Sequence, residues 1–308
     1  MKLSRNSLIL VGILMLGAIL RAVYFAESLD DPTFRYPDVD AVYHDYWARL
    51  IVGETPPPYG YPDPQIDSTP FFRPPGYPFF LALVRLVAGP SHPAAAAVQL
   101  TLSLASSLLL YLIGRKWFGD AVGLVSCAMM ATYWVFIYFS RQLLEPVLLV
   151  ALSLLLLYCL GLWTERLSSR IPFISGIVAG LSVLVRPNIL LFVAAIPLWA
   201  FWLARRRRAP HTFWIPSLVF ILGTAIAVAP ATLRNWIRAR EFVPISTNAG
   251  INLYIGNNES ARGLCTDRIA GLGAFRTCFD YPKLVDQLGA RLGKPLTHSE
   301  ASAWFTRE

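Results

Sequence analysis

The sequence predicts an all-α polytopic membrane protein. Of its 308 residues, 55% are hydrophobic and only 15% are charged, whereas about a quarter of the residues in a soluble domain are charged. The mean hydropathy is +0.50. Apolar runs recur at about the length that crosses a hydrocarbon core of roughly 30 Å. The formal charge of +8 is gathered in short clusters between these runs, so it indicates membrane topology and no nucleic-acid partner is expected.

Seven apolar runs are predicted to be transmembrane helices. The run 77–89 is shorter and contains Arg85, so it is predicted to be an interfacial helix lying along the membrane surface. The transmembrane module is therefore expected over residues 1–233, with a long first loop at 27–92, followed by a small segment at 234–308. The seven predicted spans are 7–25, 93–113, 121–139, 146–163, 171–185, 189–203 and 213–233.

The charge pattern tests this assignment, because each span reverses the side of the membrane and basic clusters prefer the cytoplasmic side. With seven spans, all four basic clusters fall on one side. The first loop, the turn before residue 146, the turn at Arg186 and the segment after Arg234 fall on the other, non-cytoplasmic side. If 77–89 were a full span, this agreement would be lost. The four basic clusters are Lys2 with Arg5, Arg115 with Lys116, Arg166 with Arg170, and residues 205–208.

The first loop contains an acidic and aromatic motif. Helical spacing places Asp40, Tyr43, His44 and Trp47 along one stripe. A carboxylate at the lipid boundary is partly desolvated, which makes it a better general base toward a hydroxyl. Asp40 is the candidate base and Asp38 the alternative. Either aspartate is also suited to begin a helix. The Asp-Val-Asp spacing resembles a metal-binding pair, but a single pair is weak evidence, so binding of a divalent metal stays open. No other cofactor is expected.

A proline-rich motif, FFRPPGYP at residues 71–78, follows in the same loop. Its three prolines fix the backbone around Arg73 and Gly76. An arginine held in this way suits a phosphate or carboxylate, because its planar guanidinium forms two parallel hydrogen bonds. The alternative is that the prolines end a helix at the interface and Arg73 contacts lipid head groups.

Further charged residues lie at the ends of the predicted spans on the same side. Glu145 precedes a span, and an ionisable residue there is a candidate site residue, although a pair with Arg141 at i,i+4 would simply neutralise both charges. Arg186 lies in a turn between spans, where it either reaches the interface or holds an anion. Arg234 opens a group of arginines outside the cytoplasmic side, which indicates binding of a lipid phosphate.

The C-terminal segment carries weaker signals. Residues 248–258 are predicted to form a short strand that ends in a Gly-Asn turn. Asn257 is either a turn residue or a ligand for hydroxyl groups. Cys127 and Cys159 are predicted to be small core hydrophobes. The other two cysteines, Cys265 and Cys278, form a disulfide if this segment faces an oxidising compartment.

The order of these motifs resembles bacterial GT-C membrane glycosyltransferases, in particular family 39-like proteins related to protein mannosyltransferases and to lipid A aminoarabinose or galacturonic acid transferases. The resemblance covers the whole chain. It rests on Asp40-Ala41, residues 72–78, Glu145-Pro146, Arg186-Pro187, Arg234-Asn235 and 256–258. The family's frequent Asp-Glu pair is Asp40-Ala41 here. Such proteins usually continue into further membrane helices, so the C-terminal segment is expected to be truncated or minimal.

The resemblance implies inverting transfer of a sugar from a polyprenyl-phosphate donor to a lipid, glycan or protein hydroxyl, on the periplasmic or outer face of a bacterial inner membrane. The expected catalytic residues are Asp40, Asp38 and Glu145. The expected substrate-binding residues are Tyr43, His44, Arg73, Tyr77, Arg141, Arg186, Arg234 and Asn257. The main alternative to a glycosyltransferase is a transporter or lipid flippase. A third possible class is a nonenzymatic scaffold. Two features argue against a transporter. The charged residues gather at one face of the membrane, and the sequence contains no inverted repeat.

Overall fold

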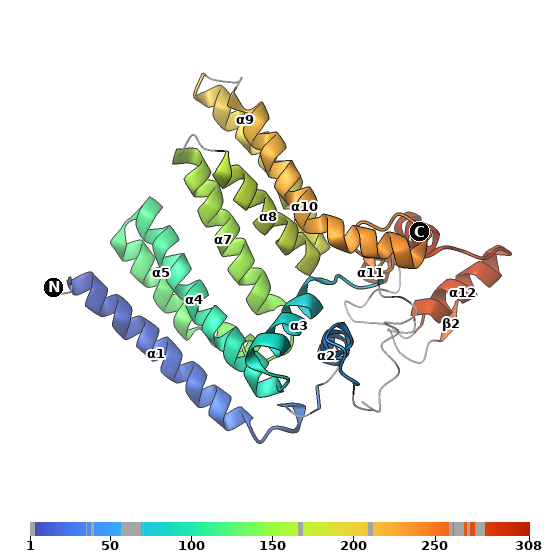
Figure 1. Cartoon of the computed structure of the whole chain (residues 1–308), viewed down its shortest axis with the longest axis horizontal. Coiled ribbons are helices and arrows are strands. Elements are labelled where there is room, and N and C mark those ends of the chain that lie inside the picture. The colour runs from blue at the N-terminus through green and yellow to red at the C-terminus, as the bar shows by residue number, and fades with distance from the viewer. Residues whose placement is uncertain are drawn as a thin grey trace. The chain divides into compact units, whose positions relative to one another are not determined.

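The computed structural model is dominated by helices (Figure 1). It describes residues 4–34, 36–37, 40–56, 69, 71–165, 169–208, 212–258, 261, 268–269, 272–274 and 281–308. The chain divides into two compact units. The first contains Met1–Tyr59 and Gly76–Ala227, and the second contains Gly60–Pro75 and Val228–Glu308.

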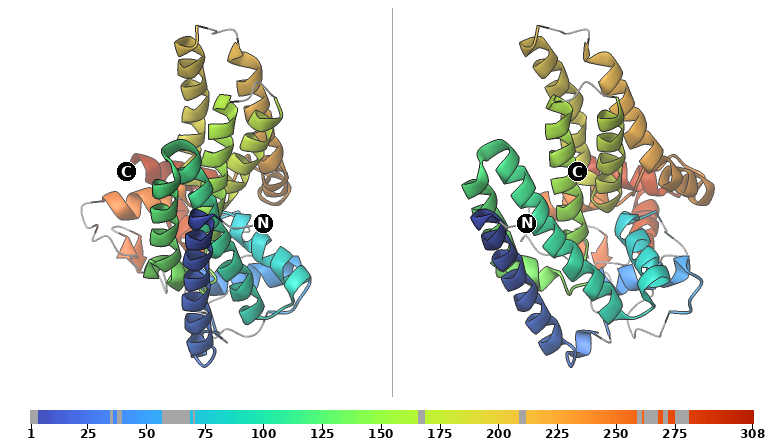
Figure 2. Two further views of the ribbon diagram at one scale, coloured as in Figure 1. Left: turned by 90° about the vertical axis from the view of Figure 1, so that its left-hand side faces the viewer. Right: turned by 60° about the vertical axis from the view of Figure 1, so that its left-hand side comes forward.

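The helices of the first unit begin with α1 (Arg5–Ser28) and the short η1 (Pro32–Phe34), then α2 (Asp40–Ile51) and α3 (Gly76–Ala88) from the first loop. The remaining helices are α4 (His92–Phe118), α5 (Asp120–Thr132), α6 (Trp134–Phe139), α7 (Pro146–Glu165), α8 (Arg170–Val185), η2 (Pro187–Ile189), α9 (Leu190–Arg206) and the first half of α10 (Trp214–Ala239). α4 packs against α1, α5 and α7, and α7 packs against α8 (Figures 1 and 2).

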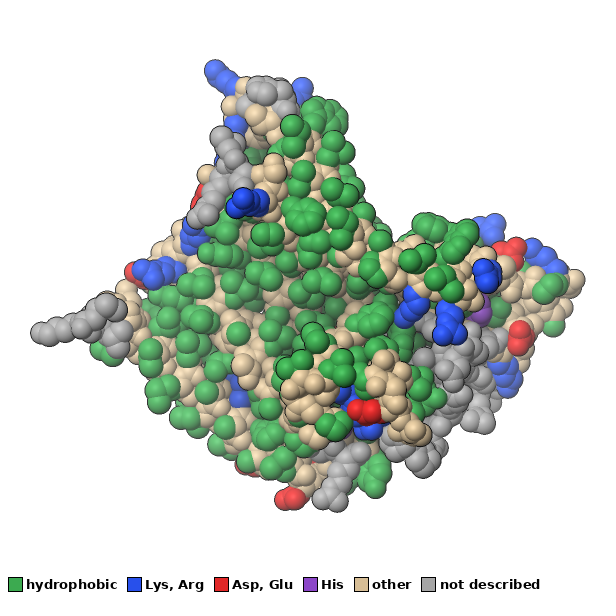
Figure 3. Space-filling model, in the orientation of Figure 1, with side chains coloured by type: hydrophobic (Ala, Val, Ile, Leu, Met, Phe, Trp, Pro, Cys, Tyr) green, Lys and Arg blue, Asp and Glu red, His purple; other side chains and the backbone are tan. Residues whose placement is uncertain are grey.

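Within the described residues, five helices are long and apolar enough to cross a membrane. They are α1, α4, α7, α9 together with η2, and α10. Their outward surfaces are apolar, as Figure 3 shows for one face. This finding confirms the predicted all-α polytopic membrane class. Two other predicted spans correspond to shorter apolar helices. The span 171–185 corresponds to α8, which has 16 residues, and the span 121–139 begins with α5, which has 13.

The predicted span 121–139 is wrong as a single helix. The backbone is extended at Tyr133, with φ −69° and ψ 121°, and this residue separates α5 from α6. The apolar pattern continues through the break, so the sequence did not reveal it. The physical reason lies in a side chain from another helix, Arg21 of α1, which binds the end of α5.

Arg21 is only 2% exposed although it belongs to a membrane helix. Its Nη1 donates to the backbone carbonyls of Ala131 at 2.6 Å and Gly17 at 3.0 Å, and its Nη2 donates to Ser103 Oγ at 3.0 Å. The last carbonyls of a helix have no N–H partner within the helix. Arg21 therefore caps the C-terminus of α5 from a different helix and stabilises the break.

The basic clusters gather at one end of the first unit. Asn6, at the start of α1, donates to Asp120 at the start of α5 at 3.1 Å. Lys116, at the end of α4, pairs with Glu165 at the end of α7 at 2.9 Å. Arg207, after α9, donates to a backbone carbonyl in the last turn of α7 at 2.6 Å. The basic ends of α1, α4 and α9 therefore meet at the same end of the helices, beside the end of α7.

The second unit has its own hydrophobic core. It contains α11 (Ala249–Asn257), α12 (Tyr281–Leu292), α13 (His298–Arg307) and the antiparallel strands β1 (Arg268–Ile269) and β2 (Gly273–Ala274). Its buried cluster is formed by Ile251, Ile269, Leu272, Leu284, Val285, Leu288, Ala301 and Phe305.

The predicted strand at 248–258 is wrong, because these residues form α11. The helix places Ile251, Tyr254 and Ile255 against the core of the second unit. Gly250 lies so close to α13 that an added Cβ would be 1.9 Å from the carbonyl oxygen of Ser302. Packing against α13 therefore overrides the alternating pattern that favoured a strand.

We expect Arg21→Met to lower the free energy of unfolding by about 3 kcal/mol, because it leaves buried carbonyls at the end of α5 without a donor. Thermal unfolding of the detergent-solubilised protein measures this loss. Arg5→Met, at the exposed start of the same helix, is the matched control and should change stability little. Equal effects of the two substitutions would contradict the capping role.

Candidate functional site

The predicted helix of the first loop is present as α2, and its stripe is largely buried. Tyr43, His44 and Trp47 are buried, and Asp40 is half-buried in the first turn. The Tyr43 ring lies edge-on to His44, with 5.9 Å between centroids, and to Trp47, with 5.6 Å. The aromatic packing fixes this face of the helix, so Asp40 and His44 have defined positions one turn apart.

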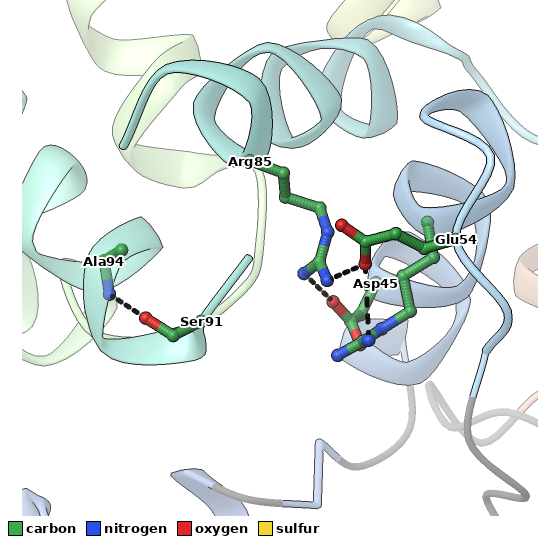
Figure 4. A network of polar contacts seen from close by, with 6 residues as sticks. Asp45, Glu54, Arg85, Ser91 and Ala94 are labelled. Carbon is green, nitrogen blue, oxygen red and sulfur yellow. Dashed lines mark hydrogen bonds and ion pairs between the residues drawn. The ribbon is translucent and has the colours of Figure 1, made fainter. Parts of the chain in front are cut away.

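An ion-pair network fixes α2 against α3 (Figure 4). Asp45 of α2 accepts hydrogen bonds from Arg85 Nη1 of α3 at 3.1 Å and from Arg49 Nε at 2.8 Å. Glu54, after α2, binds both arginines. Sequence reasoning did not include this network in the site. The i,i+4 spacing of Asp45 and Arg49 was the available signal.

Glu145 links three segments that are far apart in the sequence. Its Oε1 accepts hydrogen bonds from Arg186 Nη2 at 2.6 Å and Nε at 3.1 Å. Its Oε2 lies 3.7 Å from His44 Nε2. Glu145 precedes α7, His44 belongs to α2, and Arg186 lies between α8 and η2. The structure thus brings together three of the residues that the sequence predicted.

The environment of Glu145 keeps its carboxyl group ionised. Burial, the largest single effect, raises the pKa, but the contact with His44 and the hydrogen bonds from Arg186 together outweigh it and lower the pKa from 4.5 to about 2. A carboxyl group with this pKa cannot donate a proton near neutral pH. Glu145 therefore acts as a fixed negative charge that orients its two partners.

Tyr77 supports the same cluster from α3. It is 1% exposed, and its ring lies edge-on to His44 with 4.9 Å between centroids. Its hydroxyl donates to Gln99 Oε1 at 2.7 Å, and Gln99 Nε2 donates to the carbonyl of Gln142 at 2.8 Å. Gln99 therefore fixes the turn before Glu145. Sequence reasoning missed Gln99, because a single glutamine in an apolar run carries no pattern.

The structure explains why the proline-rich motif contains a glycine at position 76. Gly76 is the first residue of α3, and an added Cβ would lie 2.6 Å from the carbonyl carbon of Leu184. Leu184 belongs to the last turn of α8, just before Arg186. Only glycine permits this close approach, so the motif brings α3 against the segment that presents Arg186.

Arg141 has different partners from those considered in the sequence. Its Nη1 lies 3.1 Å from Asp31 Oδ2, and its Nη2 donates to Thr33 Oγ1 at 3.0 Å. The proposed i,i+4 pair of Arg141 with Glu145 is wrong, because the residues between them form no helix and Glu145 binds Arg186 instead.

A cavity of about 640 Å³ adjoins this cluster. It is formed by the end of α1, the start of α2, the start of α4 and the turn between α6 and α7. Asp40 and Arg141 both line it, together with Tyr24, Glu27, Asp31 and Tyr138. The cavity lies at the C-terminal end of α1, whereas the basic clusters meet at its N-terminal end. A half-buried carboxylate on the wall of a cavity is suited to accept a proton from a bound hydroxyl.

The remaining predicted site residues belong to other segments of the chain. Arg73 and Arg234 belong to the second unit, where Asn235 Oδ1 accepts a hydrogen bond from Arg234 Nη2 at 2.7 Å. Asn257 Nδ2 donates to the carbonyl of Leu253 at 2.7 Å within α11. Asp38 lies outside the described residues.

The predictions on cysteines and metal have separate outcomes. Cys127 and Cys159 are free and buried, which confirms that prediction. Cys265 and Cys278 lie outside the described residues, so their disulfide stays a prediction. Within the described part of the chain, no three His, Cys, Asp or Glu side chains lie close enough to hold a metal ion. The metal question stays open.

Comparison with known protein families gives a match over the middle of the chain. A family model described as dolichyl-phosphate-mannose-protein mannosyltransferase matches residues 72–232, which is just over half of the chain. No curated protein and no solved structure matches the chain significantly. The matched region includes Glu145 and Arg186 but not Asp40.

We expect Glu145→Gln to lower stability at pH 7 by about 2 kcal/mol, because the charged hydrogen bonds are lost. Since the folded pKa of Glu145 is about 2 and its ordinary value is 4.5, the contribution is fully present above pH 4.5 and is lost as pH falls toward 2. Thermal unfolding of both proteins from pH 2 to 7 tests this. Glu27→Gln, an exposed carboxylate, is the control. A difference that stays constant down to pH 2 would refute the assignment.

Proposed function

Because the chain belongs to the dolichyl-phosphate-mannose-protein mannosyltransferase family, we propose that it transfers a sugar from a polyprenyl-phosphate donor to an acceptor hydroxyl at the non-cytoplasmic face of a membrane. Membership of this family makes it a membrane glycosyltransferase of the GT-C type. The observation that carries the proposal further is the position of Asp40, which lines the 640 Å³ cavity at the opposite end of the first unit from the basic clusters.

The proposed face follows from the charge distribution. Basic residues prefer the cytoplasmic side of a membrane protein. In the first unit, the ends of α1, α4 and α9 that carry basic residues meet at one end, beside the end of α7. Asp40 and Glu145 belong to segments at the other ends of these helices. Sugar transfer is therefore proposed on the non-cytoplasmic side.

In the proposed reaction, the acceptor hydroxyl attacks the anomeric carbon of the donor sugar from the face opposite the lipid phosphate. The new carbon–oxygen bond forms as the bond from the anomeric carbon to the phosphate oxygen breaks, so the configuration inverts. Asp40 accepts the hydroxyl proton and later releases it to water. The polyprenyl phosphate leaves with the bonding electron pair.

Arg186 is the proposed partner of the leaving phosphate in the first unit. Its side chain is 51% exposed while its Nε and Nη2 are bound by Glu145. This arrangement fixes the guanidinium before the donor binds, and a fixed cation stabilises the negative charge that grows on the phosphate. Glu145 is then a positioning residue. Arg73 and Arg234 belong to the second unit, and their roles in binding the donor stay predictions.

The rival interpretation as a transporter or flippase has less support. The family description names a transferase. The charged residues of the cavity also lie near helix ends, whereas a transport path requires polar groups near the middle of the membrane.

We expect Asp40→Asn to reduce sugar transfer by about 10²- to 10⁴-fold, the usual contribution of a general base, with little change in donor binding. The assay measures radiolabelled sugar moved from a polyprenyl-phosphate donor by the purified protein. Asp30→Asn, an exposed aspartate near the end of α1, is the control, and thermal unfolding shows whether each variant is folded. Unchanged transfer by Asp40→Asn would exclude it as the base. Movement of a solute across the membrane without sugar transfer would favour the transporter or flippase interpretation.

A further inference from the structure

The end of α10 extends beyond the length that a membrane core requires. The helix has 26 residues, Trp214–Ala239, and about 20 residues cross a core of roughly 30 Å at 1.5 Å per residue. Counted from Trp214, the core is filled near Leu233. Residues 233–242, here called the boundary segment, therefore begin where the head groups begin. Pro230, inside the helix, removes one backbone hydrogen bond just before this segment.

The boundary segment exposes large apolar side chains. Leu233, Trp236 and Ile237 are 61%, 51% and 56% exposed, and they lie at i, i+3 and i+4, so they share one face of the helix. Phe242, just after the helix, is 67% exposed. Figure 3 shows hydrophobic side chains over this part of α10 with Lys and Arg side chains beside them. This face is much more apolar than a water-exposed helix end requires.

The opposite face of the segment is fixed by hydrogen bonds. Asn235 is fully buried, and its Nδ2 donates to the carbonyls of Val243 at 3.0 Å and Ile245 at 2.9 Å. Thr232 Oγ1 donates to the carbonyl of Pro244 at 2.7 Å. The helix cannot turn its apolar face inward without breaking these bonds. The exposed stripe is thus a lasting feature of the second unit.

Two arginines accompany the apolar stripe. Arg238 and Arg240 are exposed, and among the described residues neither forms an ion pair with a carboxylate. Glu241, the adjacent acid, accepts a hydrogen bond from the backbone N–H of Ser299 at 3.1 Å. Arg238 lies in the last turn of α10 and Arg240 follows the helix, at the end away from Arg208 and the basic turn, where the charge pattern of membrane proteins disfavours arginine. A negatively charged partner at this end would explain them.

We infer that the boundary segment is a lipid-binding surface for anionic phospholipids of the non-cytoplasmic leaflet. Leu233, Trp236 and Ile237 lie among the upper acyl chains, and Arg238 and Arg240 bind head-group phosphates. Tryptophan is enriched at this depth because its ring is apolar and its N–H is polar. The surface continues directly from a membrane-crossing helix, so a bilayer reaches it without any rearrangement. This inference goes beyond sugar transfer and does not depend on it.

Binding of anionic lipid to the boundary segment is tested with the whole protein in nanodiscs that contain phosphatidylcholine and phosphatidylglycerol. Native mass spectrometry then identifies the lipids that stay bound. We expect Arg238→Gln with Arg240→Gln to reduce retained phosphatidylglycerol roughly 30-fold, given the usual contribution of each arginine near an anionic surface. Lys283→Gln with Arg307→Gln removes the same charge from exposed positions of the same unit and should change retention little.

Three outcomes of this experiment would overturn the inference. An equal loss in both double variants would show a non-specific effect of net charge. Undiminished phosphatidylglycerol in the Arg238 and Arg240 variant would show that these arginines do not bind it. Retention of a polyprenyl phosphate carried over from purification, in place of phosphatidylglycerol, would assign the arginines to the donor lipid.

The depth of the apolar stripe is measured separately by fluorescence. Lipids brominated high in the acyl chain quench tryptophan on contact. The chain has nine tryptophans, so the contribution of Trp236 is the difference between the unsubstituted protein and Trp236→Phe. We expect this difference to be strongly quenched by shallow bromines and less by deep ones. A difference that bromine does not quench would show that the segment is not in the bilayer.

Discussion

The candidate site depends on one half-buried carboxylate. Glu145 lies at the edge of a membrane helix, where an unpaired charge is costly, so it requires partners from other segments. Arg186 and His44 supply them at 2.6 Å and 3.7 Å. Because these residues come from the α8–η2 turn and from α2, their pairing holds three segments of the first unit in register. Asp40, one turn before His44, takes its position from the same constraint.

The surrounding contacts each preserve this arrangement. The network of Asp45, Arg85, Arg49 and Glu54 holds α2 against α3, so α2 cannot shift along its axis. Gln99 orders the turn that carries Glu145. A glycosyltransferase that uses a fixed cation and a carboxylate base needs both groups placed before the substrates bind. The first unit meets this requirement with ion pairs at one end of its helices.

Much of the helical architecture follows from the sequence, because apolar runs of about 20 residues satisfy the backbone only as helices in a membrane. The spacing in residues 40–47 also predicted α2 and its aromatic stripe. Residues 121–139 and 248–258 show where pattern reasoning fails. Arg21 ends α5 from another helix, and α13 holds α11 as a helix. Both effects come from partners more than 40 residues away, and no local pattern contains them.

The sequence by itself determined the membrane class, the polarity of the helix ends and the candidate residues Asp40, His44, Glu145 and Arg186, because hydropathy, charge and motif order are local properties. Only the tertiary structure decided which of these charges meet. In the folded chain Arg141 pairs with Asp31. Glu145 contacts Arg186 and His44. Tyr77 packs against His44, and Gln99 holds the turn before Glu145. Burial makes an unpaired charge costly, and which partner relieves that cost depends on distances that exist only in the folded chain.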